Sequence, residues 1–83
     1  MAKHEKTLRA IFETPTRADI EWREIESLLR HLGAALTEGR GSRIRVALND
    51  VKAVFHRPHP RKEADKGCVE SVRHFLENAG YEP

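Results

Sequence analysis

The residues best suited to chemistry in this chain are two histidines, His56 and His59, which lie within its most basic stretch. Residues 39–62 hold seven of the fifteen lysines and arginines and one of the thirteen acidic residues, so this stretch carries +6 and the other residues together carry −4. An imidazole can gain or lose a proton near neutral pH, and clustered cations attract polyanions. This combination favours a site for an anionic polymer, with nucleic acid as the first candidate.

Length and composition limit what the rest of the chain can be. The 83 residues suit a single small domain, and 39% hydrophobic with 34% charged residues is typical of a soluble globular protein. The sequence contains no apolar run of the ~20 residues that a membrane helix needs. Its N-terminus lacks the apolar stretch of a signal peptide. The single cysteine, Cys68, fits a reducing compartment, so we expect a cytoplasmic protein with no membrane association.

Hydrophobic periodicity locates the elements that must position the two histidines. Helical spacing appears in three segments: residues 4–13, 20–32 and 66–78. Asp19 is the predicted N-cap of the second helix, and Gly33 and Gly80 are placed to end the second and third. Between these two helices the period falls to 2, which predicts strands over residues 34–38, 43–48 and 51–57. Whether the first helix docks on the domain or forms a flexible arm stays open.

The register of the last two strands can be tested within the sequence. A two-residue turn at Asn49-Asp50 makes three cross-strand pairs on one face entirely apolar: Leu48–Val51, Val46–Ala53 and Ile44–Phe55. The pairs on the opposite face are Ala47–Lys52, Arg45–Val54 and Arg43–His56. A slip of one residue would mix the two faces, so we predict this register. The fold expected is an α+β sandwich of two layers, helix–strand–strand–strand–helix, with an extra N-terminal helix.

Arg43 and His56 then face each other on the solvent side of the hairpin, about 5 Å apart at Cβ. A neighbouring cation favours the neutral imidazole, which is the form that accepts a proton from a ribose 2′-hydroxyl. This predicts a catalytic pair in which His56 is the base and Arg43 holds the phosphate. The alternative is that His56 is an exposed strand-end histidine with no chemical role.

A series of short segments along the chain carries a family resemblance. In order they are Leu28-Leu29, Leu32-Gly33-Ala34, Gly39-x-Gly41-Ser42, Pro58-His59-Pro60, Arg61-Lys62, Lys66-Gly67 and Phe75-Leu76-Glu77-Asn78-Ala79-Gly80. Over residues 20–80 the chain resembles the HicA toxins, small ribonucleases of bacterial toxin–antitoxin pairs. The resemblance implies a double-stranded-RNA-binding-domain fold and cleavage of mRNA without a metal or other cofactor. It also implies neutralisation by a HicB-type antitoxin.

The resemblance also exposes one departure from the family pattern. The key histidine of the family follows the Gly-Ser of the loop, and Arg43 stands at that position here. Arginine stays protonated, so it cannot be a general base, although it can stabilise charge on a phosphate. Three hypotheses follow. Another histidine supplies the proton transfer, the chain binds RNA without cutting it, or its basic face serves mainly to recognise an acidic antitoxin.

The remaining candidates surround this pair. His59 matches the His-Pro of the family and is held between two prolines, so we expect it to contact substrate or partner, with a plain turn residue as the alternative. The predicted RNA-binding residues are Arg40, Gly41, Ser42, Arg45, Arg61, Lys62 and Lys66. The predicted catalytic residues are His56, His59 and Arg43. A solvated basic surface with no ligand is the alternative for the whole set.

Other chemistry-bearing residues are expected to be structural. The apolar faces predict core positions for Trp22 and Phe55. We expect no role for three dispersed histidines: His4, His31 and His74. Cys68 is expected to be structural, although a helix start can lower the pKa of a thiol. No zinc-ligand spacing or phosphate-binding loop is present. We expect a helical extension over residues 1–18 and an RNA-binding domain over residues 19–83.

Overall fold

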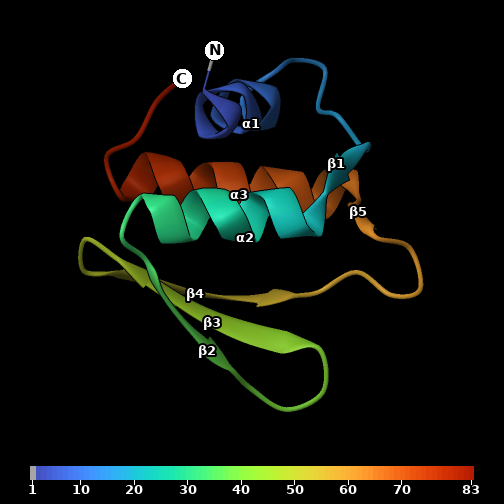
Figure 1. Ribbon diagram of the computed structural model, residues 1–83, viewed down its shortest axis with the longest axis vertical. Helices are drawn as coiled ribbons and strands as arrows, with labels where there is room; N and C mark the ends of the chain where they lie inside the picture. The colour runs from blue at the N-terminus through green and yellow to red at the C-terminus, as the bar shows by residue number, and fades with distance from the viewer. Residues whose placement is uncertain (1) are drawn as a thin grey trace.

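The computed structural model describes residues 2–83, so Met1 of the predicted extension lies outside the described residues. The elements in chain order are α1 (Lys3–Ile11), β1 (Ile20–Glu21), α2 (Trp22–His31), β2 (Ala35–Glu38), β3 (Arg43–Leu48), β4 (Val51–His56), β5 (Glu63–Ala64) and α3 (Lys66–Asn78). Helices α2 and α3 cover one face of the β2–β3–β4 sheet (Figure 1). This is the α+β arrangement of a double-stranded-RNA-binding domain, which confirms the predicted fold class. Helix α1 lies on the far side of α2 and α3 (Figure 1).

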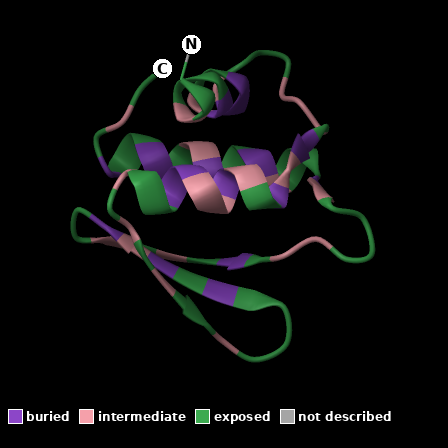
Figure 2. Ribbon diagram, viewed as in Figure 1, coloured by how far each residue is buried: buried purple, intermediate pink, exposed green. Residues whose placement is uncertain are grey.

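The hairpin of β3 and β4 has the register that the sequence predicts. All six pairs form, from Leu48–Val51 at the turn to Arg43–His56 at the open end. Asn49 and Asp50 have φ angles of 50° and 68°, as a two-residue turn of the primed type requires. The apolar side chains of one face point at the helices and the basic ones point away, so β3 alternates between buried and exposed residues (Figure 2).

The start of α2 differs from the prediction. The structure has residues 20 and 21 in β1, which pairs antiparallel with β5 through Ile20–Ala64 and Glu21–Glu63. This pairing keeps the backbone extended, so the helix begins at Trp22 instead of Ile20. Asp19 is not its N-cap, because its carboxylate is bound by Arg17 Nε and Nη2 at 2.8 and 3.1 Å. The prediction failed because β5 lies more than forty residues further along the chain.

The first helix docks on the domain, which answers the question that the sequence left open. Its apolar face buries Ile11 completely, and Thr7 and Ala10 are also buried. Arg73 of α3 binds the C-terminal end of α1, since its Nε and Nη2 donate to the carbonyls of Ile11 and Glu13 at 3.0 and 3.1 Å. Within residues 2–83, no helix is long and apolar enough to span a membrane.

Two histidines also join α1 to α2. The rings of His4 and His31 stack, with their centroids 4.3 Å apart and their planes inclined by 18°. His4 Nε2 also lies 2.9 Å from Ser27 Oγ. Desolvation, the neighbouring His31 and then Lys3 lower the pKa of His4, because each disfavours the charged imidazolium. His4 therefore belongs to the packing of the N-terminal helix, a contact that the sequence did not predict.

Trp22 and Phe55 lie in the core, as predicted. Both are buried, with their ring centroids 6.0 Å apart. Phe55 also meets Phe75 of α3 edge-on at 5.7 Å. The two predicted helix stops are confirmed by the left-handed φ angles of 96° at Gly33 and 93° at Gly80. Because Phe55 of β4 packs on Trp22 of α2 and on Phe75 of α3, the hairpin is fixed against both helices. The outer face of the sheet is therefore backed by the core.

Candidate nucleic-acid interface

Most of the predicted site residues lie at one end of the molecule. Figure 1 shows the β2–β3 loop, the end of β4, the β4–β5 connection and the start of α3 at this end. The β2–β3 loop carries Arg40, Gly41 and Ser42, while Arg43 and His56 form the adjoining pair of the hairpin. The β4–β5 connection carries His59, Arg61 and Lys62. Arg45 lies further along β3, and Lys66 lies in the helix layer. Neither is therefore directly beside the Arg43–His56 pair.

Arg43 and His56 are neighbours across the two strands. The Arg57 N–H donates to the Ser42 carbonyl at 2.8 Å, which makes the adjacent Arg43–His56 pair a non-hydrogen-bonded one. Such pairs bring the two Cα atoms to about 4.5 Å and their side chains closer than hydrogen-bonded pairs do. Both side chains are exposed, and Arg43 forms no ion pair with any residue of the described chain. The pair can therefore present a guanidinium and an imidazole to one ligand.

The loop before Arg43 is a tight turn. Gly39 N–H donates to the Arg43 carbonyl at 2.9 Å, and Arg43 N–H donates to the Arg40 carbonyl at 3.2 Å. Gly41 has a φ of 62°, the left-handed conformation that glycine adopts readily. A Cβ added to Gly39 would lie 3.3 Å from the Cβ of Arg43, so that position also favours glycine. These glycines shape the turn, and the turn leaves Arg40 and Ser42 exposed beside Arg43.

A cluster around Arg57 was missed by the sequence reasoning. Arg57 Nε and Nη2 donate to the Glu26 carboxylate at 2.7 and 3.4 Å, and Nη1 donates to Glu38 at 3.0 Å. The Trp22 indole N–H donates to the same Glu26 carboxylate. Burial disfavours the charged form of Glu26, but the hydrogen bonds from Arg57 and Trp22 outweigh it and lower the pKa of this carboxyl. The hydrogen bonds to Glu26 and Glu38 raise the pKa of Arg57.

This cluster changes how the basic stretch is interpreted. Arg57 contributes to the sequence count of positive charge, but two carboxylates neutralise it in the fold. Its side chain instead ties the end of β4 to α2 and to the end of β2. His56 directly precedes Arg57 in β4. The imidazole therefore projects from a strand end that the ion pairs of Arg57 fix to both Glu26 and Glu38. No periodicity or spacing identifies this contact, because Glu26 and Arg57 are 31 residues apart.

The connection that follows β4 is anchored at its far end. The Trp22 N–H donates to the Lys62 carbonyl at 2.9 Å, which fixes this connection against the start of α2. His59 is exposed between Pro58 and Pro60, and the His59–Pro60 peptide bond is cis. Arg61 lies 3.8 Å from Glu63 in an exposed ion pair, and such pairs are easily exchanged for another anion. The connection is thus fixed at Lys62, and His59 lies exposed three residues before this anchor.

The start of α3 offers less to an anion than the sequence suggests. Asp65 is the N-cap, and its carboxylate accepts a hydrogen bond from the Cys68 N–H at 2.8 Å. A negative charge of the protein itself already occupies this helix end, although Lys66 remains exposed. Burial, with a smaller contribution from Asp65, raises the pKa of the Cys68 thiol to about 11. The lowering of the thiol pKa that a helix start can cause is therefore not found, and the structural role expected for Cys68 is favoured.

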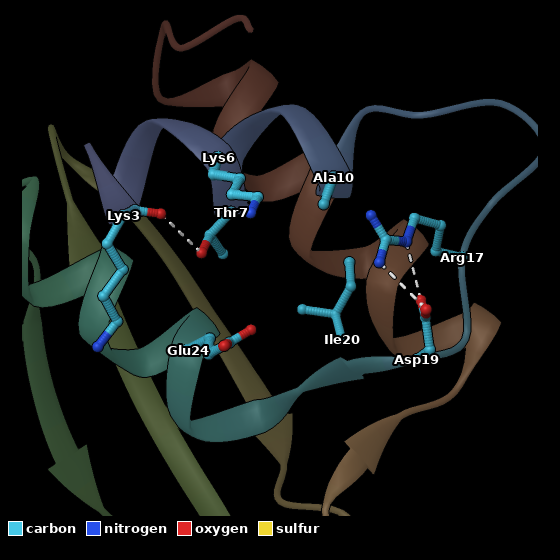
Figure 3. A pocket seen from close by; sticks show the side chains of 8 residues that line it. All are labelled: Lys3, Lys6, Thr7, Ala10, Arg17, Asp19, Ile20 and Glu24. Carbon is cyan, nitrogen blue, oxygen red and sulfur yellow. Dashed lines mark hydrogen bonds and ion pairs between the residues drawn. The ribbon is translucent and has the colours of Figure 1, made fainter. Parts of the chain in front are cut away.

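A cavity of about 460 Å³ lies between α1 and the segment leading into α2, on the side of the helix layer away from the sheet (Figure 1). Figure 3 shows its lining, in which Lys3 and Lys6 come from α1 and Glu24 from α2. The Arg17 guanidinium turns to Asp19 instead of pointing into open space (Figure 3). Mixed charges of this kind do not select an anion. The cavity is therefore separate from the candidate interface.

Comparison with known proteins identifies one family. A family model described as HicA toxin of bacterial toxin–antitoxin matches residues 22–81. The match extends from the first residue of α2 to just beyond α3, so it includes the whole candidate interface and leaves α1 outside. Searches among curated proteins and among solved structures gave no match. The resemblance inferred from the sequence is thus confirmed at the level of the family.

Proposed function

Because the chain belongs to the HicA toxin family, we propose that it is a metal-independent endoribonuclease that acts on mRNA and is neutralised by a HicB-type antitoxin. The observation that carries this proposal is the exposed Arg43–His56 pair on the outer face of the hairpin. An imidazole beside a guanidinium is a combination that can remove a proton and stabilise a phosphate at one point. The pair therefore offers a replacement for the histidine that the family carries at the position of Arg43.

The proposed reaction is an internal transfer within the RNA strand. His56 accepts the proton of a ribose 2′-hydroxyl, and the resulting oxygen attacks the adjacent phosphorus. The bond to the 5′-oxygen of the next nucleotide breaks as the 2′,3′-cyclic phosphate forms, and the departing oxygen takes up a proton. His59 is the next exposed imidazole along the chain and is our candidate for supplying that proton. Arg43 stabilises the negative charge that develops on the phosphate in between.

The surrounding polar and cationic side chains are assigned to binding. Arg40 and Ser42 flank the pair on the loop, and Arg61 and Lys62 lie on the connection beyond it. Contacts of these side chains with phosphates would set the position of the strand on the protein without reading its sequence. Affinity should then fall steeply as salt rises, because each neutralised phosphate releases counterions.

A second function is favoured by one observation, the arginine at the position of the family's histidine. An arginine cannot act as a base, so a chain that relied on this position alone would bind RNA and leave it intact. The two functions share the same surface and differ only in whether His56 acts on the bound strand.

The test is to incubate the purified protein with end-labelled RNA in a buffer containing EDTA and to analyse the ends of the products. The proposal predicts fragments that end in a 2′,3′-cyclic phosphate. RNA that stays intact at saturating protein, while a binding assay still detects the complex, would overturn cleavage and select RNA binding alone. RNA that is neither bound nor cut would overturn both functions.

A further inference from the structure

Arg57 contacts both ends of the β2–β3 loop as well as helix α2. Its N–H donates to the carbonyl of Ser42, the last residue of the loop, at 2.8 Å. Its Nη1 donates at 3.0 Å to the carboxylate of Glu38, the residue of β2 directly before the loop. Its Nε and Nη2 donate to Glu26 of α2. This one residue therefore joins four parts of the fold: β2, the loop, β4 and α2.

The two carboxylates that bind Arg57 differ in their exposure to water. The side chain of Glu26 is 15% exposed and also accepts a hydrogen bond from the Trp22 indole, so this contact is largely shielded. The side chain of Glu38 is 73% exposed, and exposed ion pairs contribute little to stability. Substitution of Glu38 should therefore leave the fold intact. It can separate the effect of Arg57 on the candidate site from its effect on folding.

The parts that Arg57 joins surround the Arg43–His56 pair. This pair is the last one at the open end of the hairpin, and strand ends open more readily than strand centres. The bond from the Arg57 N–H to Ser42 lies directly beyond the pair. Opening of this bond would let the imidazole move away from the guanidinium of Arg43. A displacement of about 1 Å in a catalytic group can lower a reaction rate 10²-fold, so the stability of this strand end matters for chemistry.

The contacts of the Arg57 guanidinium indicate a role that does not involve the substrate. All three of its nitrogen atoms donate to carboxylates of the protein. A phosphate would have to displace Glu26 or Glu38 in order to take their place, and the negative charge of both residues would repel it. Arg57 is therefore suited to hold the site in place, whereas Arg43 is suited to contact the ligand.

We propose that Arg57 is a positioning residue, which holds the strand end that carries His56 against the loop that leads to Arg43. It acts through Glu26 and Glu38 and does not touch the substrate. The consequence for RNA cleavage rests on the proposed function. Lysine cannot take over this role, because an ammonium group lacks the planar fork that binds two carboxylates in fixed directions.

The test measures single-turnover cleavage of RNA by Arg57→Lys and by Glu38→Gln. Arg57→Lys keeps the charge but removes the fork, so the rate should fall about 10–100-fold. Glu38→Gln removes one of the two contacts and should lower the rate about 3–10-fold. The dissociation constant for RNA and its dependence on salt should stay as in the wild type for Arg57→Lys, because no phosphate contact is lost.

Arg17→Lys provides a matched control. Arg17 also binds two carboxylates, those of Asp19 and Glu13, through Nε, Nη1 and Nη2, but it lies on the segment between α1 and β1. The same substitution there should leave the cleavage rate of the folded protein unchanged. Circular dichroism and thermal unfolding check that each variant is folded. If Arg57→Lys does not fold, Glu38→Gln gives the same comparison from an exposed side chain.

Hydrogen exchange of the residue 57 amide, followed by NMR, measures the strand end without any substrate. This amide donates to Ser42, so it exchanges only when the end of the hairpin opens. Arg57→Lys should speed its exchange at least about 10-fold, while amides at the centre of the hairpin stay protected. Arg17→Lys should leave the exchange of this amide unchanged.

The outcomes separate this inference from the proposed function. Faster exchange and slower cleavage by Arg57→Lys, with unchanged RNA affinity, would support the positioning role. Cleavage by the folded variant at the wild-type rate would overturn it. A Glu38→Gln variant that binds RNA more tightly and cuts it faster would also overturn it, because that result would make Arg57 a phosphate ligand. A wild-type protein that cuts no RNA would overturn the proposed function, and the exchange rates alone would then decide whether Arg57 holds the strand end.

Discussion

His4 and His56 each lie beside a second basic side chain, but on opposite sides of the molecule and in opposite environments. His4 stacks on His31 and meets Ser27 at the contact between α1 and α2. His56 faces Arg43 at the open edge of the hairpin, where both side chains are exposed. The imidazole of His4 is therefore engaged in contacts within the protein, whereas the nitrogen atoms of the His56 imidazole are accessible to a ligand.

Two arginines repeat the same contrast at shorter range. Arg57 is held by Glu26 and Glu38, so its charge serves the fold. Arg43 lies one cross-strand position away and has no ion pair within residues 2–83. The difference teaches that the packing around a charge decides its role, since the residue type is the same at both positions. Changes on the helix side should therefore act on stability, and changes on the outer face of the sheet should act on function.

The largest effect on stability is expected from Ile11→Ala in α1. Ile11 is fully buried, so its truncation removes packed methyl groups and leaves a cavity. We predict a loss of about 2–4 kcal/mol in the free energy of unfolding, measured with urea. Cleavage of RNA per folded molecule should stay at the wild-type rate. A large loss of cleavage activity in the folded variant would contradict the assignment of stability to the helix side and of function to the outer face of the sheet.

The second prediction concerns Glu26, which links α2 to the end of the sheet through Arg57. Glu26→Gln keeps the size of the side chain but removes the charge that neutralises Arg57. The free energy of unfolding should fall by about 1–3 kcal/mol, because a charged hydrogen-bonded pair that is mostly shielded from water is lost. Glu5→Gln removes an exposed i,i+4 pair with Arg9 and should cost less than about 0.5 kcal/mol. Equal effects of the two substitutions in urea titrations would contradict the assigned role of the cluster.

On the functional side, Arg40→Ala should weaken RNA binding without changing stability. Arg40 is exposed on the β2–β3 loop, so no packing is lost. The slope of log K against log salt should become shallower by about 1, because one phosphate contact is removed. The measurement is a fluorescence anisotropy titration at four salt concentrations. Arg23→Ala, on the exposed surface of α2, provides the matched control and should leave the slope unchanged.

The smallest effect is expected from the pH dependence at His4. The lowered pKa means that the folded state binds this proton less readily than the unfolded state does. Its stabilising contribution is therefore present above the ordinary histidine value of about 6.5 and is lost as the pH falls through the folded pKa. His4→Gln should flatten the acid side of the stability curve, measured by urea unfolding between pH 5 and 8. An acid side that stays as steep in His4→Gln as in the wild type would contradict this contribution of His4.

Local sequence patterns predicted most of the fold for identifiable reasons. The Asn49-Asp50 turn and the alternation on either side of it determined the hairpin register, and every predicted pair is present. The predicted start of α2 was wrong because it depends on the pairing of Ile20 with Ala64, which is a contact between distant segments. The family resemblance was readable because its segments keep their order and spacing along the chain.

The candidate site was predictable only where it follows strand alternation. Arg43 and His56 could be placed opposite each other because both lie on one hairpin. The neutralisation of Arg57 by Glu26 and the stacking of His4 on His31 depend on how separate helices dock, which no local pattern specifies.

The most direct test of the account is the rate of RNA cleavage by His56→Ala under single-turnover conditions. His74→Ala serves as the control, because it removes another exposed imidazole, from α3. Removal of a general base typically lowers the rate by 10²–10⁴-fold, so we predict a loss of at least about 100-fold for His56→Ala and none for His74→Ala. RNA binding by the His56 variant should remain within a few-fold of the wild type. Cleavage by His56→Ala at the wild-type rate would contradict the assignment of catalysis to the outer face of the sheet.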